Sequence, residues 1–183
     1  MDGLAARGLR FENAFVTTPI CAASRASILT GRREGRHGYT FGTPPMGSAL
    51  AEGSFPMRLR ESGYRTGFVG KWGVRFEKGV MDGAYDLFRP MGLPYRKEGK
   101  AHLTDRIGEA AESFVAEGGD EPFCLMVSFW APHAEDSHPD QYLPAADLAG
   151  MYDHVDVDLP PLSDVGFGAL PEFLQRSLGR TRW

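Results

Sequence analysis

The sequence predicts an α/β protein, because helix-like and strand-like segments alternate along the chain. Residues 102–116 place apolar side chains on one face at helical spacing. Residues 122–130 form a continuous apolar run, which is typical of a strand buried on both faces of a parallel sheet. Residues 64–73 predict a second strand, which ends in a lysine between glycines. A chain of 183 residues with 42% hydrophobic content can supply one domain's core.

The first third of the chain is expected to contain short helices and one strand. Helices are expected at residues 2–7, 25–29 and 55–62. Ser24 is a suitable N-cap for the second helix, and Gly31 and Gly63 are placed to end the second and third. Residues 9–16 alternate apolar and polar side chains over their first half, as a strand does, and residues 40–53 are rich in Gly, Pro and Thr, which predicts a loop.

Less regular segments fill the rest of the chain. Gly118 and Gly119 are placed to end the helix at 102–116. Turns, loops or connectors are expected at residues 79–89, 93–100, 139–148 and 152–161, and a last helix at 170–178. The segment 152–161 contains three carboxylates but no glycine, so it is a poor match for a calcium-binding loop.

Composition excludes some partners and leaves the compartment open. A net charge of −4 implies no general attraction to nucleic acid or to an anionic membrane. No signal peptide is visible and no apolar run reaches membrane-spanning length. Arg32, Arg33 and Arg36 cluster, either as a solvated surface or as an anion-attracting rim, and the first interpretation is slightly favoured. A disulfide between Cys21 and Cys124 is not expected, because Cys124 lies in the apolar run.

The segment 21–32 is the most informative part of the sequence. Cys21 stands just before the predicted start of a helix, where the positive end of the helix stabilises thiolates and anions. One alternative is a buried cysteine without a chemical role. Another is a phosphatase-like thiolate loop, which needs an arginine six positions after the cysteine. Ser27 occupies that position, so this loop is excluded.

The pattern Cys-x-Ala-Ser-Arg-x-x-x-Leu-Thr-Gly-Arg at 21–32 resembles the signature of the formylglycine-dependent sulfatases. The resemblance implies an alkaline-phosphatase-like α/β fold, a mostly parallel sheet sandwiched by helices, which is incomplete in this chain. It also implies that a formylglycine-generating enzyme oxidises Cys21 to formylglycine. The hydrate of this group is the nucleophile of the family, and Arg25 would hold it and its charge.

Two further segments resemble site segments of the same family. Residues 64–73 are similar to Gly-Tyr-x-Thr-x-x-x-Gly-Lys-Trp-His, in which the lysine reaches the sulfate group. Lys71 would neutralise a sulfate oxygen, but Gly73 replaces the histidine, which leaves one sulfate contact without a counterpart. Residues 131–133 resemble the family's Pro-His segment, so His133 would donate a hydrogen bond or proton to the leaving oxygen. A surface lysine and a structural histidine are the alternative interpretations.

The remaining histidines carry no such motif. His102, His138 and His154 are expected on the surface, and the role of His37 is left open.

The family also uses a divalent cation, usually calcium, held by carboxylate and amide oxygens together with the formylglycine oxygen. Cys21 is the one position of that ligand set present here, since the sequence contains no Asp-Asp pair. Residues 1–183 are therefore expected to be a partial catalytic domain, covering its N-terminal-to-middle part. The first metal-binding strand and the C-terminal metal segment would be absent.

The resemblance implies a sulfuric ester hydrolase that acts on a sulfated small molecule or carbohydrate. Because metal ligands are missing, activity of residues 1–183 alone is expected to be very poor. Two alternatives stay open. One is a phosphate or phosphonate monoester hydrolase of the same superfamily, and the other is an inactive fragment that is no enzyme.

Overall fold

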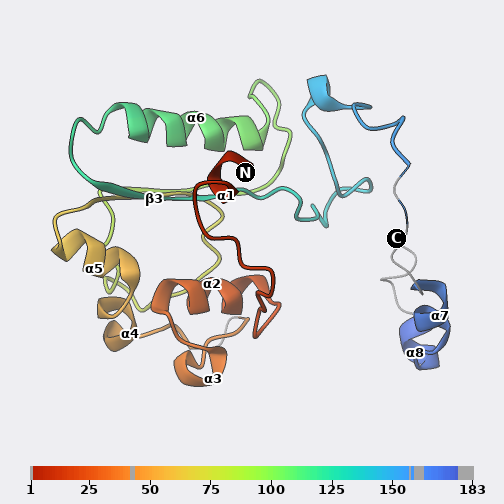
Figure 1. Cartoon of the computed structure of the whole chain (residues 1–183), viewed down its shortest axis with the longest axis horizontal. Coiled ribbons are helices and arrows are strands. Elements are labelled where there is room, and N and C mark those ends of the chain that lie inside the picture. Colours follow the sequence, from red (N-terminus) through yellow and green to blue (C-terminus); the bar gives the residue numbers. More distant parts are fainter. Residues whose placement is uncertain (1, 42–43, 157, 159–162, 177–183) are drawn as a thin grey trace. The chain divides into compact units, whose positions relative to one another are not determined.

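The computed structural model describes residues 2–41, 44–156, 158 and 163–176. The chain divides into two compact units, Met1–Ala145 and Ala146–Trp183. The first unit contains the sheet and most of the helices (Figure 1). The second contains the 3-10 helix η1 (Ala146–Leu148) and helices α7 (Ser163–Gly168) and α8 (Glu172–Gln175).

A small parallel sheet is the centre of the first unit. Its described strands are β1 (Arg65–Gly70), β2 (Leu87–Pro90) and β3 (Phe123–Ser128), in the order β2-β1-β3. β1 pairs in parallel with both neighbours, and Gly70 lies opposite Pro90 on one side and Ser128 on the other. The three strands therefore end at the same edge, where ligands of open parallel sheets usually bind.

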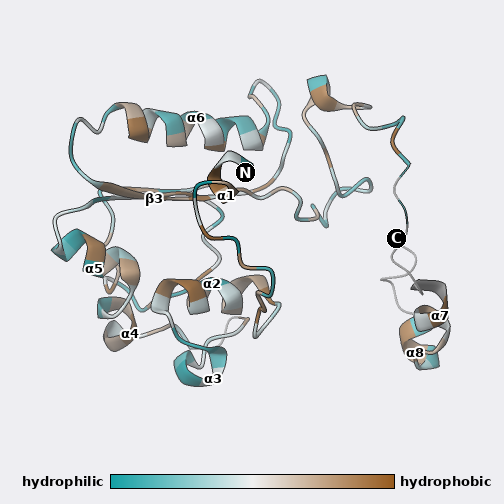
Figure 2. Ribbon diagram, viewed as in Figure 1, coloured by the Kyte–Doolittle hydropathy of each residue, from teal (hydrophilic) through white to brown (hydrophobic). Residues whose placement is uncertain are grey.

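Helices lie on both faces of this sheet. α6 (Leu103–Ala116) covers one face, and α2 (Cys21–Thr30) and α5 (Phe55–Glu61) lie on the other (Figure 1). In Figure 2 β3 is coloured as hydrophobic, whereas the short helix α3 (Glu34–His37) is hydrophilic. The remaining helices of the unit are α1 (Asp2–Ala5) and α4 (Ser48–Glu52).

Two hydrophobic clusters fill the two sides of the sheet. The first packs α2 against the loops that follow it, and its buried members are Ala22, Ala26, Leu29, Tyr39, Met46 and Val74. The second packs α6 against the sheet, with Val69, Tyr95, Leu103, Ile107 and Ala110. This division fits the three-layer architecture expected of an α/β fold. Within the described residues, no helix has the length and apolar character needed to cross a membrane.

The long regular elements agree with the sequence-based expectations. α6 begins at Leu103 with His102 as its N-cap, whose side chain accepts a hydrogen bond from the Thr104 amide. α5 ends at Glu61, followed by the C-cap Ser62 and then by Gly63, which adopts a left-handed backbone conformation. The predicted strand at 64–73 is confirmed as β1 and the one at 122–130 as β3.

Several local predictions are wrong. Residues 9–16 form no strand and are almost entirely exposed, because no described strand offers them a partner. α2 begins at Cys21 rather than at Arg25, and Ile20 takes the N-cap position expected of Ser24. The Ser24 amide already bonds the Ile20 carbonyl at 2.8 Å within the first helical turn. Burial of β3 on both faces is also wrong, since Phe123 and Val127 stay partly exposed.

Short elements were missed by sequence reasoning. β2 falls in the expected turn segment 79–89, and α4 falls in the expected loop 40–53. α7 was not predicted, and the predicted helix 170–178 is reduced to α8 in the described residues. Residues 157, 159–161 and 177–178 of the expected connector and helix lie outside the described part of the chain.

Candidate active site

Arg25 joins α2 to the carboxyl ends of two strands. Its Nη1 donates a 2.7 Å hydrogen bond to the backbone oxygen of Lys71 and a second bond to the Ser128 hydroxyl. The Lys71 amide in turn donates to the Ser128 carbonyl at 2.8 Å. Gly70 lets the two strand ends approach, because a Cβ added there would lie 2.1 Å from the Ser128 oxygen. The arginine thus sits at the sheet edge where β1 and β3 end.

Cys21 opens onto the same place. It is the first residue of α2, one turn before Arg25, so both side chains lie on one face of the helix. Both residues line a pocket of about 470 Å³ between α2 and the sheet. The other lining residues are Ser24, Ile28, Leu29, Phe68, Trp72, Met126, Val127 and Ser128. The pocket is largely apolar, with its polar groups contributed by the cysteine, the arginine and the two serines.

Lys71 is a buried cation beside these groups. Its side chain is 7% exposed, and Nζ lies 4.4 Å from the centre of the Trp130 ring. Burial lowers the pKa of Lys71, the Cys21 thiolate acts to raise it, and the Arg25 charge lowers it further. Burial also lowers the pKa of Arg25, against the opposing effect of Cys21. Two partly desolvated cations therefore interact electrostatically with position 21, and such a cluster of positive charge favours a bound anion.

His133 is connected to Lys71 through Trp130 and is not part of the pocket wall. The Trp130 and His133 rings meet edge to face with centroids 5.4 Å apart. His133 is exposed, and its Nδ1 lies 2.8 Å from the Ala134 carbonyl oxygen. A carbonyl accepts only, so Nδ1 carries the proton and Nε2 is left available for another partner.

Gly73 takes the position of the family's histidine in a conformation suited to glycine. Its φ is +66°, in the left-handed region. A Cβ there would lie 3.4 Å from the Cδ of Arg25. The side chain of Arg25 therefore lies beside the exposed glycine, and a larger residue would press on the arginine.

The other histidines have structural contacts. His37 is buried, accepts a hydrogen bond on Nδ1 from the Tyr39 amide, and so donates from Nε2 to the Ser27 hydroxyl at 3.0 Å. The surface prediction is wrong for His102, which is half-buried and stacks on the Tyr95 ring. His154 is exposed as expected, whereas His138 is only partly exposed and contacts Asp140.

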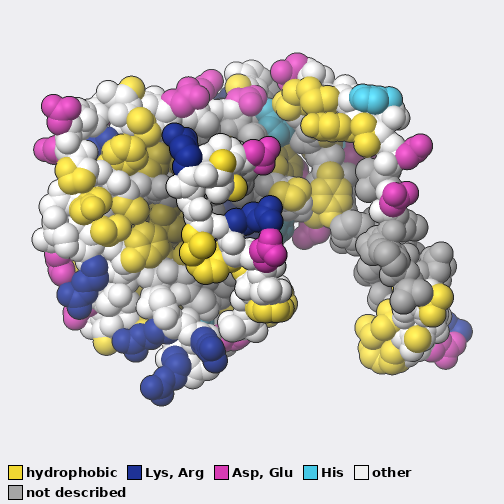
Figure 3. All heavy atoms as spheres, viewed as in Figure 1, with side chains coloured by type: hydrophobic (Ala, Val, Ile, Leu, Met, Phe, Trp, Pro, Cys, Tyr) yellow, Lys and Arg dark blue, Asp and Glu magenta, His cyan; other side chains and the backbone are white. Residues whose placement is uncertain are grey.

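Arg32, Arg33 and Arg36 are all exposed, next to and within α3. Figure 3 shows Lys and Arg side chains gathered at the lower end of this view, over α3. This placement agrees with the interpretation as a solvated surface.

Sequence reasoning missed Ser128 and Trp130 as parts of the site. The signal for both is their place at the end of a predicted strand, where side chains face the ligand edge of a parallel sheet. The described residues contain no group of three His, Cys, Asp or Glu side chains able to hold a metal ion. The donor set of these residues therefore does not fit a calcium site of oxygen ligands.

Comparison with known proteins identifies the family. The sulfatase family model matches residues 1–154. The chain belongs to the sulfatase family. Its small parallel sheet with flanking helices is accordingly a sulfatase-like α/β fold.

Among its relatives are the N-acetylglucosamine-6-O-sulfatase of Bacteroides thetaiotaomicron, 26% identical over 84% of this chain, and the human N-sulphoglucosamine sulphohydrolase, 33% identical over 73% of it. The chain spans 28% and 26% of the lengths of these two sulfatases. Human arylsulfatase A is 38% identical over 52% of this chain, which spans 20% of its length.

Solved structures agree with this fold. One protein, solved with its substrate D-glucosamine-2-N,6-O-disulfate, superposes with a TM-score of 0.69 at 26% identity. The match covers 87% of this chain and 33% of that one. A second protein, solved with a neocarrahexaose, has a TM-score of 0.64 at 21% identity, and the match covers 81% of this chain and 41% of that one. The second likeness concerns the fold alone.

Proposed function

We propose that this chain carries the nucleophile-bearing part of a sulfatase site and takes part in the hydrolysis of sulfate esters. The observation that carries the proposal is the double hydrogen bond of Arg25, which ties the Cys21 helix to Lys71 and Ser128. This arrangement sets a potential nucleophile and two cations at one edge of the sheet. A sulfate ester spreads its negative charge over three oxygens, so fixed cations around it stabilise the transition state.

Each side chain would have a separate task. Formylglycine at position 21, once formed, supplies a hydrated aldehyde whose oxygen is a nucleophile. Arg25 would hold that group from the next turn of α2, where its guanidinium is already oriented by two hydrogen bonds. Lys71 would bind a sulfate oxygen with an ammonium that has little water around it. His133 would act at the leaving oxygen through Nε2: with one proton held on Nδ1 by the Ala134 oxygen, a second proton taken up on Nε2 would be donated to the leaving oxygen.

Calcium is a family expectation, and position 21 is the one ligand that the resemblance assigns in this sequence. No acidic cluster accompanies Cys21 in the described residues. We therefore assign no step of the reaction to a metal.

The substrate and partner proposals follow from the relatives. One solved neighbour binds a glucosamine disulfate, and two relatives carry glucosamine sulfatase names. We propose a sulfated carbohydrate, or another sulfated small molecule, as the substrate class. A formylglycine-generating enzyme would be the maturation partner. The names of the relatives include an extracellular sulfatase homologue of Caenorhabditis elegans, so an oxidising compartment is compatible with the proposal.

The deciding experiment is the mass of the Cys21 peptide after co-expression with a formylglycine-generating enzyme. Conversion of the thiol to the aldehyde lowers the peptide mass by about 18 Da, a covalent change beyond the encoded sequence. Cys124 is the matched control, because it is the other cysteine of the chain and lies on β3 outside the motif. An unmodified Cys21 alongside an active maturation enzyme contradicts the proposal and favours the inactive alternative.

A second assay separates the hydrolase alternatives. The converted chain is offered an aryl sulfate and the matching aryl phosphonate at equal concentration. Faster release of the aryl alcohol from the sulfate supports the proposal, and faster release from the phosphonate supports the phosphonate hydrolase. Conversion without any turnover leaves the modification intact but contradicts activity of residues 1–183 by themselves.

A further inference from the structure

Tyr95 forms two hydrogen bonds to the segment that contains His133, one through its hydroxyl and one through its backbone amide. Its hydroxyl donates a 2.6 Å hydrogen bond to the backbone oxygen of His133. Its backbone amide donates a 2.9 Å bond to Oε2 of Glu135. Tyr95 is 2% exposed and Glu135 is 5% exposed, so both bonds are shielded from competing water. Residues about forty positions apart in sequence are thereby fixed to each other.

Tyr95 itself is fastened to the start of α6. Its backbone oxygen accepts a 2.8 Å bond from the Leu103 amide, and Leu103 is fully buried. Its ring stacks on the His102 ring, with an angle of 3° and centroids 5.4 Å apart. The phenol oxygen therefore has a fixed position relative to the helix that covers the sheet. It is a rigid donor rather than a mobile surface group.

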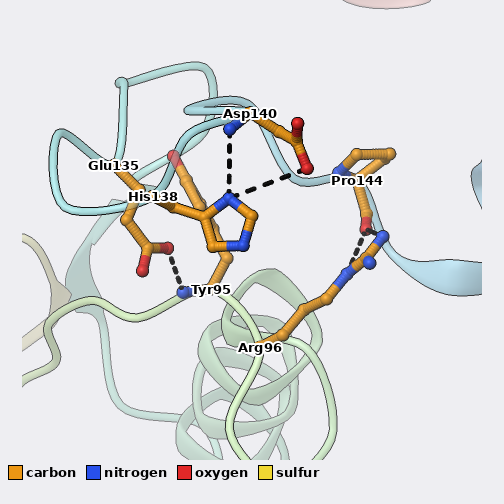
Figure 4. A network of polar contacts seen from close by, with 6 residues as sticks. All are labelled: Tyr95, Arg96, Glu135, His138, Asp140 and Pro144. Atoms are coloured by element: carbon orange, nitrogen blue, oxygen red, sulfur yellow. Dashed lines mark hydrogen bonds and ion pairs between the residues drawn. The ribbon is translucent and has the colours of Figure 1, made fainter.

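Other hydrogen bonds hold the segment 133–145 near Tyr95, but none of those described next involves His133 (Figure 4). His138 accepts a bond from the Asp140 amide on Nδ1, and Arg96 donates to the Pro144 carbonyl. His102 Nε2 donates to the Leu143 oxygen at 2.9 Å. In Figure 4 the carboxylate of Glu135 points to the amide of Tyr95, whereas the guanidinium of Arg96 points to Pro144. Tyr95 is thus distinct from the other contacts of this segment, because its hydroxyl reaches residue 133.

The backbone of His133 decides where its imidazole lies. Nδ1 donates to the oxygen of the next residue, Ala134, so this bond depends on the orientation of the peptide that joins the two residues. The oxygen of that peptide is the one that Tyr95 holds. Burial raises the pKa of Tyr95, the Glu135 charge raises it too, and the bond to His133 acts in the opposite direction. The hydroxyl thus stays protonated, and a donor, across the neutral pH range.

We propose that Tyr95, oriented by Glu135, is a positioning residue for His133. Its hydrogen bonds to residues 133 and 135, called the clamp below, fix the 133–134 peptide. The clamp thereby keeps one proton on Nδ1 and leaves Nε2 free to take up a second proton and pass it on. The inference rests on the catalytic role proposed above for His133. It assigns to Tyr95 and Glu135 no contact with substrate. Their effect passes through the histidine ring alone.

The test uses the whole chain labelled with ¹⁵N-histidine, whose side-chain nitrogen shifts report the tautomer. His133 is assigned by the loss of its signals in His133→Ala. We expect the Nδ1–H form in the wild-type chain and a several-fold loss of that form in Tyr95→Phe and Glu135→Leu. Glu135→Gln should restore it, because an amide oxygen can still accept from the Tyr95 amide. Arg96→Ala is the matched control, since it removes a bond to the same segment but leaves the clamp.

His37 serves as an internal check of folding, because its buried ring has the opposite tautomer, Nε2–H. If Glu135→Leu loses the His37 signal, that variant is misfolded. The test of the proposal then rests on Tyr95→Phe, which removes a single oxygen. Unchanged His133 shifts in Tyr95→Phe, or an equal change in Arg96→Ala, would overturn the proposal.

The nitrogen shifts of His133 do not depend on turnover. A failure of the sulfatase proposal can therefore be told apart from a failure of the Tyr95 proposal. Where the converted chain is active, Tyr95→Phe should lower kcat by about tenfold with KM unchanged, since His133 would act in the transition state.

Discussion

The Nη1 nitrogen of Arg25 lies 2.7 Å from the backbone oxygen of Lys71 and also bonds the Ser128 hydroxyl. One guanidinium thus ties α2 to the ends of β1 and β3. The same residue faces Cys21 within a partly desolvated pocket. Removing the Arg25 side chain would therefore affect stability and chemistry together. A conservative substitution of Arg25 is more informative.

Arg25→Lys should weaken both the fold and the site. The single nitrogen of a lysine lies on a shorter, flexible side chain and cannot take the position of Nη1 in the rigid guanidinium, so at least one of the two partly buried acceptors loses its donor. We expect the free energy of unfolding to fall by about 1–3 kcal/mol and hydrolysis by the converted chain to fall by about 100-fold. Urea denaturation and aryl sulfate turnover measure the two effects. Arg32→Lys, on the exposed surface, should change stability by less than about 0.5 kcal/mol, and equal losses in both variants would contradict the assignment.

Gly73→Ala should destabilise the chain although it adds one methyl group. The alanine would have to adopt φ near +66°, with Cβ 3.4 Å from the Arg25 Cδ. The expected loss is about 1–2 kcal/mol in thermal or urea unfolding. Gly108→Ala is the opposite case, because it lies in α6 with nothing within 4 Å of an added Cβ. That change should stabilise by about 0.5–1 kcal/mol, and effects of the same sign in the two variants would show that backbone conformation does not set the difference.

His37 should make stability depend on pH. Burial lowers its pKa below the ordinary value of 6.5, and the Glu34 charge opposes this shift only in part. The folded state therefore favours the neutral ring, so this stabilisation is fully present above pH 6.5 and declines as the pH falls to the lowered folded pKa. His37→Gln should flatten the decline in Tm between pH 7 and 5. The other four histidines are common to both proteins, and parallel Tm curves would refute the prediction.

Lys71→Gln should weaken the binding of inorganic sulfate to the chain. The variant removes a buried cation, so we expect the Kd to rise by about tenfold or more, as for a lost charged hydrogen bond. In the wild-type chain, affinity should fall as the pH rises to the Lys71 pKa, which lies below 10.5 because of burial. Calorimetric titration measures both. Lys78→Gln, at an exposed position, is the control and should leave Kd unchanged.

Elements with a long-range pattern were predictable from sequence. α6 shows its apolar face in the spacing of Leu103, Ile107 and Phe114, and β3 shows an apolar run. The start of α2 was not predictable in the same way, because Ser24 is a good N-cap but the helix begins at Cys21, four residues before the predicted start at Arg25. β2 has four residues and little burial, so its pairing with β1 rather than its own sequence makes it a strand.

The motif residues were easier to find than the groups that hold them. Cys21, Arg25 and Lys71 were identified by resemblance, and the structure brings the first two into one pocket with Lys71 alongside. The contact of Arg25 with Ser128 joins residues 103 positions apart, and no local pattern encodes such a separation. The hydrogen bond from Tyr95 to the His133 oxygen likewise joins residues that are far apart in the sequence.

The parallel pairing of β1 with β3 also sets an order of assembly. Gly70 and Ser128 become neighbours only after the intervening residues, α6 among them, have closed a long loop, and such closures are slow. Cys21 and Arg25 lie on a local helix that can form early. The anion-binding groups of the two strand ends can meet them only when the last strand docks. During refolding, recovery of sulfate binding should therefore lag behind recovery of helical structure.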